Sequence, residues 1–325
     1  MKNIAKILLG ILLLLNITSC SIETEQQEAT KNNMSKEVIS QEQTPSTIEI
    51  VNKLCSDEFG GRLVGSEGNE KAANYISGIF RGIGLEPLNG ENYYMPHRRE
   101  LYTEYELIYN NDKSENKVVN NVVGVIKGKD SEKAIVISAH FDHIGYKDGQ
   151  IIRGALDNAS GVAALMKIAN ILNNQSKNQL FDRDIIIASF NGEEKGRQGS
   201  KAFANDIKDK YSSLYNINID CVGGKKAGKI SLNNKSKISD KLTNQMKKTF
   251  KDNQMKFSDK ILKNVTSDHK SFEKSEISNI FIGQDNLKPY VHNIHDNPES
   301  LNYDEIDKVV KVICDFIEKN HEYDF

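Results

Sequence analysis

Tryptophan is absent from the 325-residue sequence, and cysteine is rare, with four residues. Three of these, Cys55, Cys221 and Cys314, have spacings that suit neither a zinc site nor an iron–sulfur cluster. An excess of charge is also missing, because 43 Lys and Arg residues nearly balance 45 Asp and Glu residues. A protein that binds nucleic acid normally carries a basic surface. We therefore expect no nucleic acid, and a small-molecule or peptide partner instead.

The N-terminus has an apolar stretch, Ile7–Leu15, that is too short for a comfortable membrane span. Lys2 and Lys6 precede it, which is the layout of a secretory signal. The stretch leads to Ile-Thr-Ser-Cys at 17–20, which resembles the lipobox of bacterial lipoproteins. The resemblance implies that residues 1–20 are a signal peptide and that Cys20 becomes lipidated, anchoring the exported protein to the cell envelope. An ordinary signal peptide with a chance cysteine is the alternative, and either one takes the protein out of the cytoplasm.

Residues 21–44 are almost entirely Glu, Gln, Lys, Asn, Ser and Thr, with little to bury. Such a composition predicts a solvated, disordered tether. Residues 45–325 are then the folded domain.

The domain alternates apolar, strand-like segments with segments of helical periodicity. Strands are predicted at 101–109, 118–126, 133–139, 184–190, 214–220 and 277–283, and helices at 48–55, 72–80, 158–173, 237–250 and 302–320. Such alternation is typical of one α/β sandwich around a mainly parallel sheet. The glycine-rich segment 57–69 between the first two helices lacks the lysine of a phosphate-binding loop, and we interpret it as a structural turn.

Acidic and imidazole side chains follow the predicted strands at the points where those strands end. They comprise His140, Asp142, His143, Asp157, Glu193, Glu194 and Asp220, and the C-terminal part adds His292, His295 and Asp296. Each alone has an ordinary explanation; Asp157, for example, is a good N-cap for the helix after it. Together they collect at the edge of an open α/β sheet where ligands bind.

So many carboxylates at one edge repel one another unless they bind cations. Histidines combined with carboxylates suit Zn²⁺, Co²⁺ or Mn²⁺ better than copper or an iron–sulfur cluster. A catalytic zinc ion usually has three protein ligands and an open position, so a set of five ligands would exceed what one ion requires. Two ions that share a carboxylate would use all five.

At these positions the sequence resembles the M28 family of zinc-dependent aminopeptidases, of the bacterial leucyl aminopeptidase type. The motifs that carry the resemblance are SAHFDHIG, GALDNASGVAAL, NGEEKGRQGS, NIDCVGG, SDHKSF and VHNIHDN, in the family's order, and 59–80 resembles its N-terminal segment. The resemblance implies a three-layer α/β/α sandwich with a mixed, mainly parallel sheet, as in zinc exopeptidases. It also implies hydrolysis of the N-terminal residue from peptides with a free N-terminus.

The resemblance further implies a site with two Zn²⁺ ions, for which Co²⁺ or Mn²⁺ are possible substitutes. His140 and Asp220 bind one ion. Glu194 and His292 bind the other, and Asp157 bridges both.

Two catalytic roles follow from the same resemblance. Glu193 is the general base, which explains why two adjacent glutamates follow one strand. Asp142 orients the His140 imidazole. The peptide bond between Asp157 and Asn158 is expected to be cis, as it commonly is at this position in the family.

Three alternatives remain open on the sequence. A glutaminyl cyclase shares the scaffold but uses one zinc; a carboxypeptidase or dipeptidase is a second possibility; and a non-catalytic, peptide-binding lipoprotein is a third. Four further residues have unassigned roles: Asp268 and His269 are candidates for the pocket wall, His295 is expected on the surface, and Cys221 is expected to be a thiol packed beneath the site.

Overall fold

The structure is a computed structural model that describes residues 44–102, 114–233, 236–260, 262 and 266–325. The predicted signal peptide and all of the tether but Thr44 lie outside this part, as does most of the strand expected at 101–109. Within the described residues, none of the helices combines the length and the apolar character that a membrane span requires.

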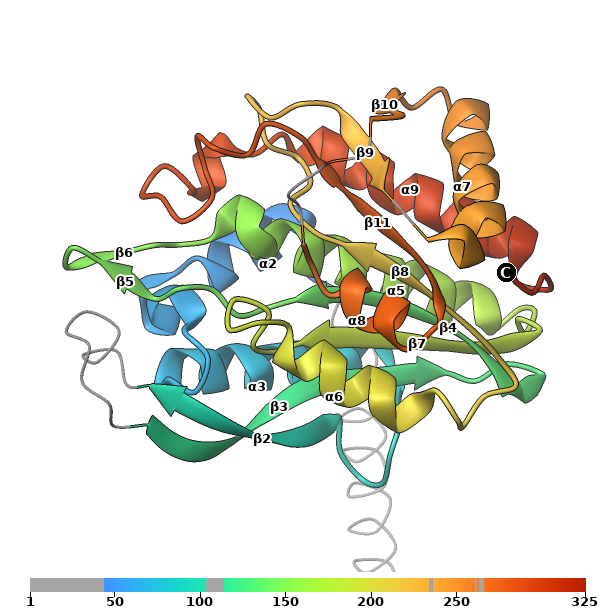
Figure 1. Cartoon of the computed structure of the whole chain (residues 1–325), viewed down its shortest axis with the longest axis horizontal. Helices are drawn as coiled ribbons and strands as arrows, with labels where there is room; N and C mark the ends of the chain where they lie inside the picture. Colours follow the sequence, from blue (N-terminus) through green and yellow to red (C-terminus); the bar gives the residue numbers. More distant parts are fainter. Residues whose placement is uncertain (1–43, 103–113, 234–235, 261, 263–265) are drawn as a thin grey trace, which may run out of the picture. The chain divides into compact units, whose positions relative to one another are not determined.

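The described part of the chain contains a nine-stranded mixed sheet (Figure 1). Its order is β1-β3-β7-β4-β8-β11-β9-β10, and β2 also pairs with β3. The strands are β1 (Glu86–Pro87), β2 (Tyr94–Tyr102), β3 (Ser114–Ile126), β4 (Asp130–His140), β7 (Arg183–Phe190), β8 (Ser213–Ile219), β9 (Ile230–Asn233), β10 (Phe257–Ser258) and β11 (Ser278–Gln284). A separate small hairpin joins β5 (Tyr146–Lys147) to β6 (Gln150–Ile151).

The four central strands, β7, β4, β8 and β11, are parallel to their neighbours within this group. Their carboxyl ends therefore lie at one edge, as the sequence predicts. The flanking pairs β1–β3, β2–β3, β3–β7 and β9–β11 are antiparallel. All eight residues of β7 are buried, because helices cover both faces of the sheet.

Helices pack on both faces of the sheet and complete the three layers (Figure 1). One face carries α2 (Thr47–Leu54), α3 (Glu67–Ile83), α5 (Ser160–Ser176), α7 (Asp240–Asp252) and α9 (Tyr303–Asn320). The opposite face carries α6 (Gln198–Ile207) and α8 (His269–Lys274). The three-layer fold, its mixed sheet and the five predicted helices are confirmed.

The alternation of side chains along the strands builds a separate core on each face. In β4, for example, Ile135 and Ile137 join the larger core, whereas Ala134 and Val136 join the smaller one. Fully burying an aliphatic side chain of this kind stabilises the fold by about 1.5–3 kcal/mol. The two cores thus pack the helices against the two faces of the sheet and fix the strands whose ends carry the polar residues.

The glycine-rich segment 57–69, predicted as a turn, forms the 3-10 helix η1 (Asp57–Arg62), a short connection and the first residues of α3, and its anchor is a buried arginine. The Arg62 guanidinium donates to the carbonyl oxygens of Leu54 (2.6 Å), Phe141 (2.7 Å), Arg153 (2.8 Å) and Gly154 (2.8 Å). Arg62 is fully buried. It thereby connects the loop that follows β4 to the loop that precedes α5, and these two loops carry candidate site residues.

Candidate metal centre

Two groups of acidic and imidazole side chains meet at the carboxyl edge of the parallel strands. His140 ends β4, Asp157 lies in the turn before α5, and Asp220 follows β8. Glu194 follows β7, and His292 lies in the loop after β11. The structure thus brings together all five residues that the resemblance names as ligands, and Asp157 belongs to both groups.

The first group consists of His140, Asp157 and Asp220. Nε2 of His140 lies 3.4 Å from Oδ1 of Asp157 and 3.5 Å from Oδ1 of Asp220. Burial lowers the pKa of His140, but the nearby carboxylates, Asp220 foremost, outweigh it and hold that pKa well above its ordinary value. Burial likewise opposes ionisation of Asp220, yet His140 lowers its pKa overall.

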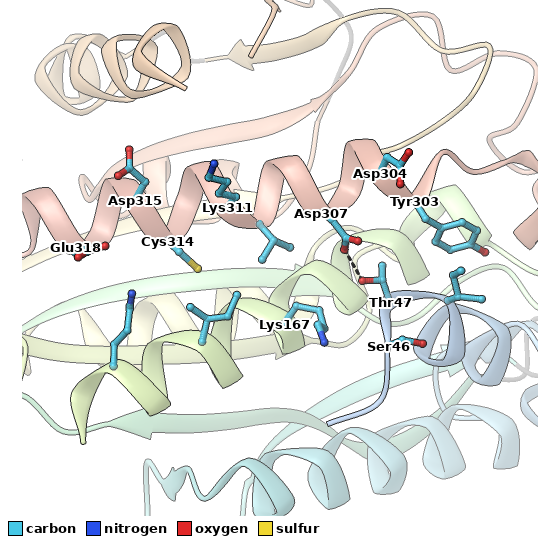
Figure 2. A pocket seen from close by; sticks show the side chains of 14 residues that line it. Ser46, Thr47, Lys167, Tyr303, Asp304, Asp307, Lys311, Cys314, Asp315 and Glu318 are labelled. Carbon is cyan, nitrogen blue, oxygen red and sulfur yellow. Dashed lines mark hydrogen bonds between the residues drawn. The ribbon is translucent and has the colours of Figure 1, made fainter. Parts of the chain in front are cut away.

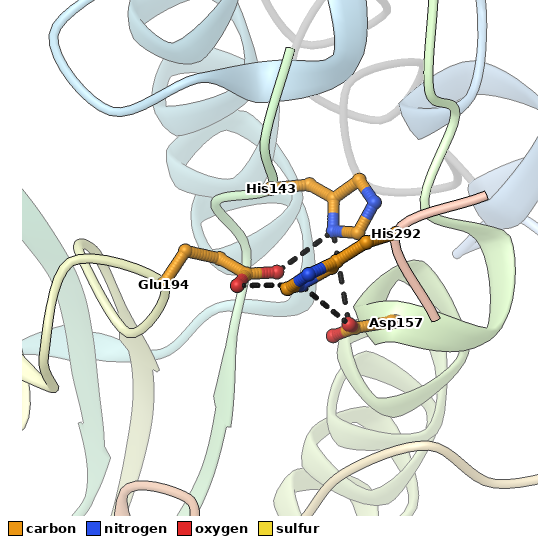
Figure 3. Close-up of side chains that lie close together, drawn as sticks. All are labelled: His143, Asp157, Glu194 and His292. Carbon is orange, nitrogen blue, oxygen red and sulfur yellow. Dashed lines mark hydrogen bonds and ion pairs between the residues drawn. The ribbon is translucent and has the colours of Figure 1, made fainter. Parts of the chain in front are cut away.

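The second group consists of Asp157, Glu194 and His292 together with His143 (Figure 3). Oε2 of Glu194 lies 2.8 Å from Nε2 of His292, and Oε1 lies 2.9 Å from Nδ1 of His143. Oδ2 of Asp157 is 3.7 Å from the same His292 nitrogen. Burial alone would raise the pKa of Glu194, but the hydrogen bonds from both histidines hold it well below its usual range.

Asp157 is held at the centre by contacts on both sides of its peptide group. The Asp157–Asn158 bond is cis, as the resemblance predicts. Asp296 accepts hydrogen bonds from the backbone N–H groups of Leu156 (2.6 Å) and Asp157 (3.1 Å). The side chain of Asn158 donates to the carbonyl of Ile219 (3.0 Å), next to Asp220. These contacts fix the Asp157 carboxylate relative to the end of β8.

The Asp142 side chain binds chiefly the backbone of Glu193 and Glu194. Its carboxylate oxygens accept hydrogen bonds from the backbone N–H groups of Glu193 (3.0 Å) and Glu194 (3.2 Å). Nδ1 of His140 lies closer to the Asp142 carbonyl (3.2 Å) than to its carboxylate (3.6 Å). Asp142 therefore fixes the loop that carries both glutamates, and its backbone carbonyl orients the imidazole.

Glu193 belongs to neither of the two groups. Burial, and the nearby Asp268, Asp220 and Glu194, raise the pKa of its carboxyl to about 10, although His140 opposes the shift. Glu193 also lines a cavity of about 1250 Å³, together with Asp157, Glu194, Asp220 and His292. A carboxylate in this place faces whatever enters the cavity.

The other walls of the cavity combine apolar and basic side chains. Phe281, Leu287 and Val291 give it apolar surface, and Arg197 and Lys288 add positive charge. A second hollow, of about 560 Å³, lies between α2, α5 and α9 (Figure 2). Thr47 donates to Asp307 (2.6 Å) there, but neither candidate metal group reaches it.

The residues without an assigned role fall into different places. His295 is exposed, as expected. Asp268 and His269 are buried at the start of α8 and belong to neither group; burial raises the pKa of Asp268 to about 7. Cys221 is buried and lines the cavity beside Asp220, and burial raises the pKa of its thiol well above the ordinary value. The burial of Cys221 agrees with the interpretation from the sequence that it is a packed thiol.

The sequence predicts no role for His143 or Asp296. Both occur in the quoted motifs, SAHFDHIG and VHNIHDN, but no periodicity separates them from the exposed histidine at 295. Their importance comes from contacts between segments that are distant in the sequence.

Comparison with known proteins gives a family match over residues 121–317, to peptidase family M28. The chain belongs to this family. The matched region contains both candidate metal groups, from His140 to His292. A comparison of the sequence with curated proteins gave no match.

Solved structures with the same fold include proteins with two different named activities. BSAP, a zinc aminopeptidase from Bacillus subtilis, is 15% identical, with a TM-score of 0.66 over 85% of this chain and 96% of that one. The LapA aminopeptidase of Legionella pneumophila is 20% identical, with a TM-score of 0.67 over 90% and 76%. A glutaminyl cyclase from Bacteroides thetaiotaomicron is 20% identical, with a TM-score of 0.66 over 86% and 100%. At these identities the likeness establishes the fold of this M28 chain.

The two groups fit divalent metal ions by their chemistry. Oδ1 of Asp220 is buried and has no hydrogen-bond partner among the described residues, although it points toward His140. Burial, and the nearby Glu194, raise the pKa of Asp157, because two carboxylates share this site. Cations would relieve that repulsion, and imidazole with carboxylate is a donor set that suits zinc.

Proposed function

We propose that this M28 chain is an aminopeptidase that uses two divalent metal ions. The observation that carries the proposal is the shared position of Asp157. One of its carboxylate oxygens faces His140, and the other faces His292. A carboxylate placed between two donor groups is the arrangement that a pair of ions requires.

His140 and Asp220 would hold one ion, Glu194 and His292 the other, and Asp157 would bridge them. Zinc suits the donors best, and Co²⁺ or Mn²⁺ are substitutes. When bound, the ions would polarise the scissile carbonyl and lower the pKa of water at the site.

Glu193 is the residue that moves the proton. It lines the cavity, and both metal groups leave its carboxylate unused. We assign it to take a proton from the attacking water and to deliver that proton to the leaving amine. Divalent ions nearby lower the pKa of a carboxyl, which would bring Glu193 from about 10 toward the range of a general base.

The substrate class follows from the acidic groups that line the cavity. Four carboxyl groups lie in its wall, those of Asp157, Glu193, Glu194 and Asp220. A free α-amine is cationic or a metal ligand, so an acidic pocket favours peptides with an unblocked N-terminus.

The test is a panel of aminoacyl anilides, each with a free or an acetylated α-amine, assayed with zinc-replete protein. We expect hydrolysis of free substrates only. Equal hydrolysis of acetylated anilides would point to an amidase or an endopeptidase, and cleavage of N-acetylated peptides with a free C-terminal carboxylate would point to a carboxypeptidase. No turnover of any of these substrates at full metal content would favour a peptide-binding protein.

Glutaminyl cyclase activity is the second candidate, because a glutaminyl cyclase shares the fold. The presence of both metal groups favours hydrolysis, since cyclisation needs one ion. A peptide with N-terminal glutamine, followed by mass spectrometry, separates the two. Loss of the whole residue indicates a peptidase, and loss of ammonia alone indicates a cyclase.

We also propose that the protein is anchored through a lipid on Cys20. The support is the motif at 17–20 after the short apolar stretch. The Cys20→Ser variant, expressed in a bacterium, is expected to leave the membrane fraction. Membrane association that survives the substitution would refute the anchor.

A further inference from the structure

His143 lies inside the second metal group, although the predicted ligand set omits it. Its side chain is fully buried. The backbone N–H donates to the carbonyl of Arg62 (3.2 Å), and the ring packs against Gly154, where a Cβ would come within 2.6 Å of ring carbons. The ring is therefore fixed, with Nδ1 directed at Glu194 (Figure 3).

Two roles agree with the distances from Nδ1. It lies 2.9 Å from Oε1 of Glu194 and 3.9 Å from Oδ2 of Asp157. Donor atoms around a tetrahedral zinc ion are separated by roughly 3.3 Å, given bonds of about 2.0–2.1 Å. His143 is thus either a further ligand or a hydrogen-bond donor to Glu194.

The second ring nitrogen distinguishes these roles. An imidazole that binds metal through one nitrogen carries its proton on the other, and that N–H almost always has an acceptor. His140 shows this arrangement, since its Nε2 faces two carboxylates and its Nδ1 lies 3.2 Å from the carbonyl of Asp142. Nε2 of His143 is buried and has no hydrogen-bond partner among the described residues.

A ligand role would leave the Nε2–H of His143 buried without an acceptor, at a cost of about 1–3 kcal/mol. If His143 instead donates through Nδ1, its Nε2 carries only a lone pair. A buried acceptor without a partner is less rare than a buried N–H group without one. The donor role also satisfies Nδ1, through the 2.9 Å contact.

We propose that His143 is a positioning residue, in the Nδ1–H tautomer, that donates to Oε1 of Glu194 and directs Oε2 to the metal. Asp142 fixes the backbone of the same glutamate. The inference rests on the proposed two-metal function. It leaves Asp157, Glu194 and His292 as the protein ligands of the second ion, so that this site keeps an open position, whereas a fourth protein ligand would close it.

Two substitutions at this position separate the hydrogen-bond donor role from the metal-ligand role. His143→Asn keeps an N–H donor near the place of Nδ1 but offers no good metal ligand through that nitrogen. His143→Asp offers a ligand oxygen but no donor, and it places a negative charge against Glu194. The exposed His295→Asn serves as the matched control.

The measurement is Zn²⁺ affinity at each site, by chelator competition on metal-stripped protein. Loss of a residue that orients a ligand typically weakens metal binding 10- to 100-fold. We expect this loss at one site in His143→Asp and in His143→Ala, and affinity within a few fold of wild type in His143→Asn and His295→Asn. The opposite order, with the Asp variant retaining affinity and the Asn variant losing it, would overturn the proposal.

A measurement on the unsubstituted protein covers the case in which variants misfold. In zinc-loaded protein, ¹⁵N NMR should find a protonated Nδ1 and an unprotonated Nε2 at His143; a metal-bound Nδ1 with a proton on Nε2 would overturn the inference. Wild-type protein that binds fewer than two ions would instead refute the proposed function, whatever the state of His143. The two failures are therefore distinguishable.

Discussion

Replacement of Glu193 by Gln removes the proposed base while keeping its size. The side chain lies outside both metal groups, so the variant should still bind two ions. General acid–base catalysis contributes roughly 10²- to 10⁴-fold, which corresponds to about 3–5.5 kcal/mol of barrier. We expect kcat to fall by that factor, with little change in metal content.

The matched control is the adjacent residue. Glu194→Gln weakens a predicted ligand and should lower metal content as well as kcat. Initial rates on an aminoacyl anilide, with metal analysis of the same samples, separate the two effects. A Glu193→Gln protein with both ions and a kcat within tenfold of wild type would refute the assignment of Glu193 as the base.

Three further outcomes follow from the contacts around the site. Asp296→Asn replaces an acceptor of two backbone N–H groups, one of them from Asp157. The substitution should lower the unfolding free energy, measured by denaturant titration, by about 1–3 kcal/mol and should weaken zinc binding. An unchanged unfolding free energy and zinc affinity would contradict the role of Asp296 in holding Asp157. Arg62→Met leaves four carbonyls without their donor and should cost at least about 3 kcal/mol in the same assay; a loss below 1 kcal/mol would count against the anchor. Nearby carboxylates raise the pKa values of His140 and His292 in the metal-free protein, so zinc binding should release protons near pH 7 and weaken as pH falls. Calorimetry of zinc binding in buffers of different ionisation enthalpy measures the proton release. Binding heats that do not depend on the buffer would refute it.

The pKa of Glu193 predicts how the stability of the metal-free protein depends on pH. Its folded-state pKa of about 10 lies above the ordinary value of 4.5, so the folded protein holds a proton that the unfolded chain releases. This contribution is complete below pH 4.5 and is lost as pH rises toward 10. Glu193→Gln should remove the dependence, as measured by urea titrations at several pH values. An unchanged pH profile would contradict it.

The sequence predicts most of the fold, and the strand ends at which the candidate site residues lie, because both depend on local patterns. An apolar run followed by His140, Glu194 or Asp220 marks a strand end, and parallel strands bring such ends to one edge. The connection from 57 to 69 is predicted as a turn for the same reason, from its glycines. The buried role of Arg62 within it depends on four carbonyls that only the fold assembles.

Contacts between distant loops lie beyond such patterns. Asp296 is buried against Leu156, 140 residues away in sequence, whereas its neighbour His295 is exposed. Nothing in VHNIHDN distinguishes these neighbours. His143 likewise acquires its role because the loop after β4 and the loop after β7 meet. The preference of Asp142 for the glutamate backbone has the same origin.

The most direct test of the central claim is a crystal structure of the zinc-loaded protein, with anomalous diffraction recorded on both sides of the zinc absorption edge. We predict two zinc peaks, one on each side of the Asp157 carboxylate, with Glu193 bound to neither. A single peak, or peaks away from Asp157, would contradict the two-metal site.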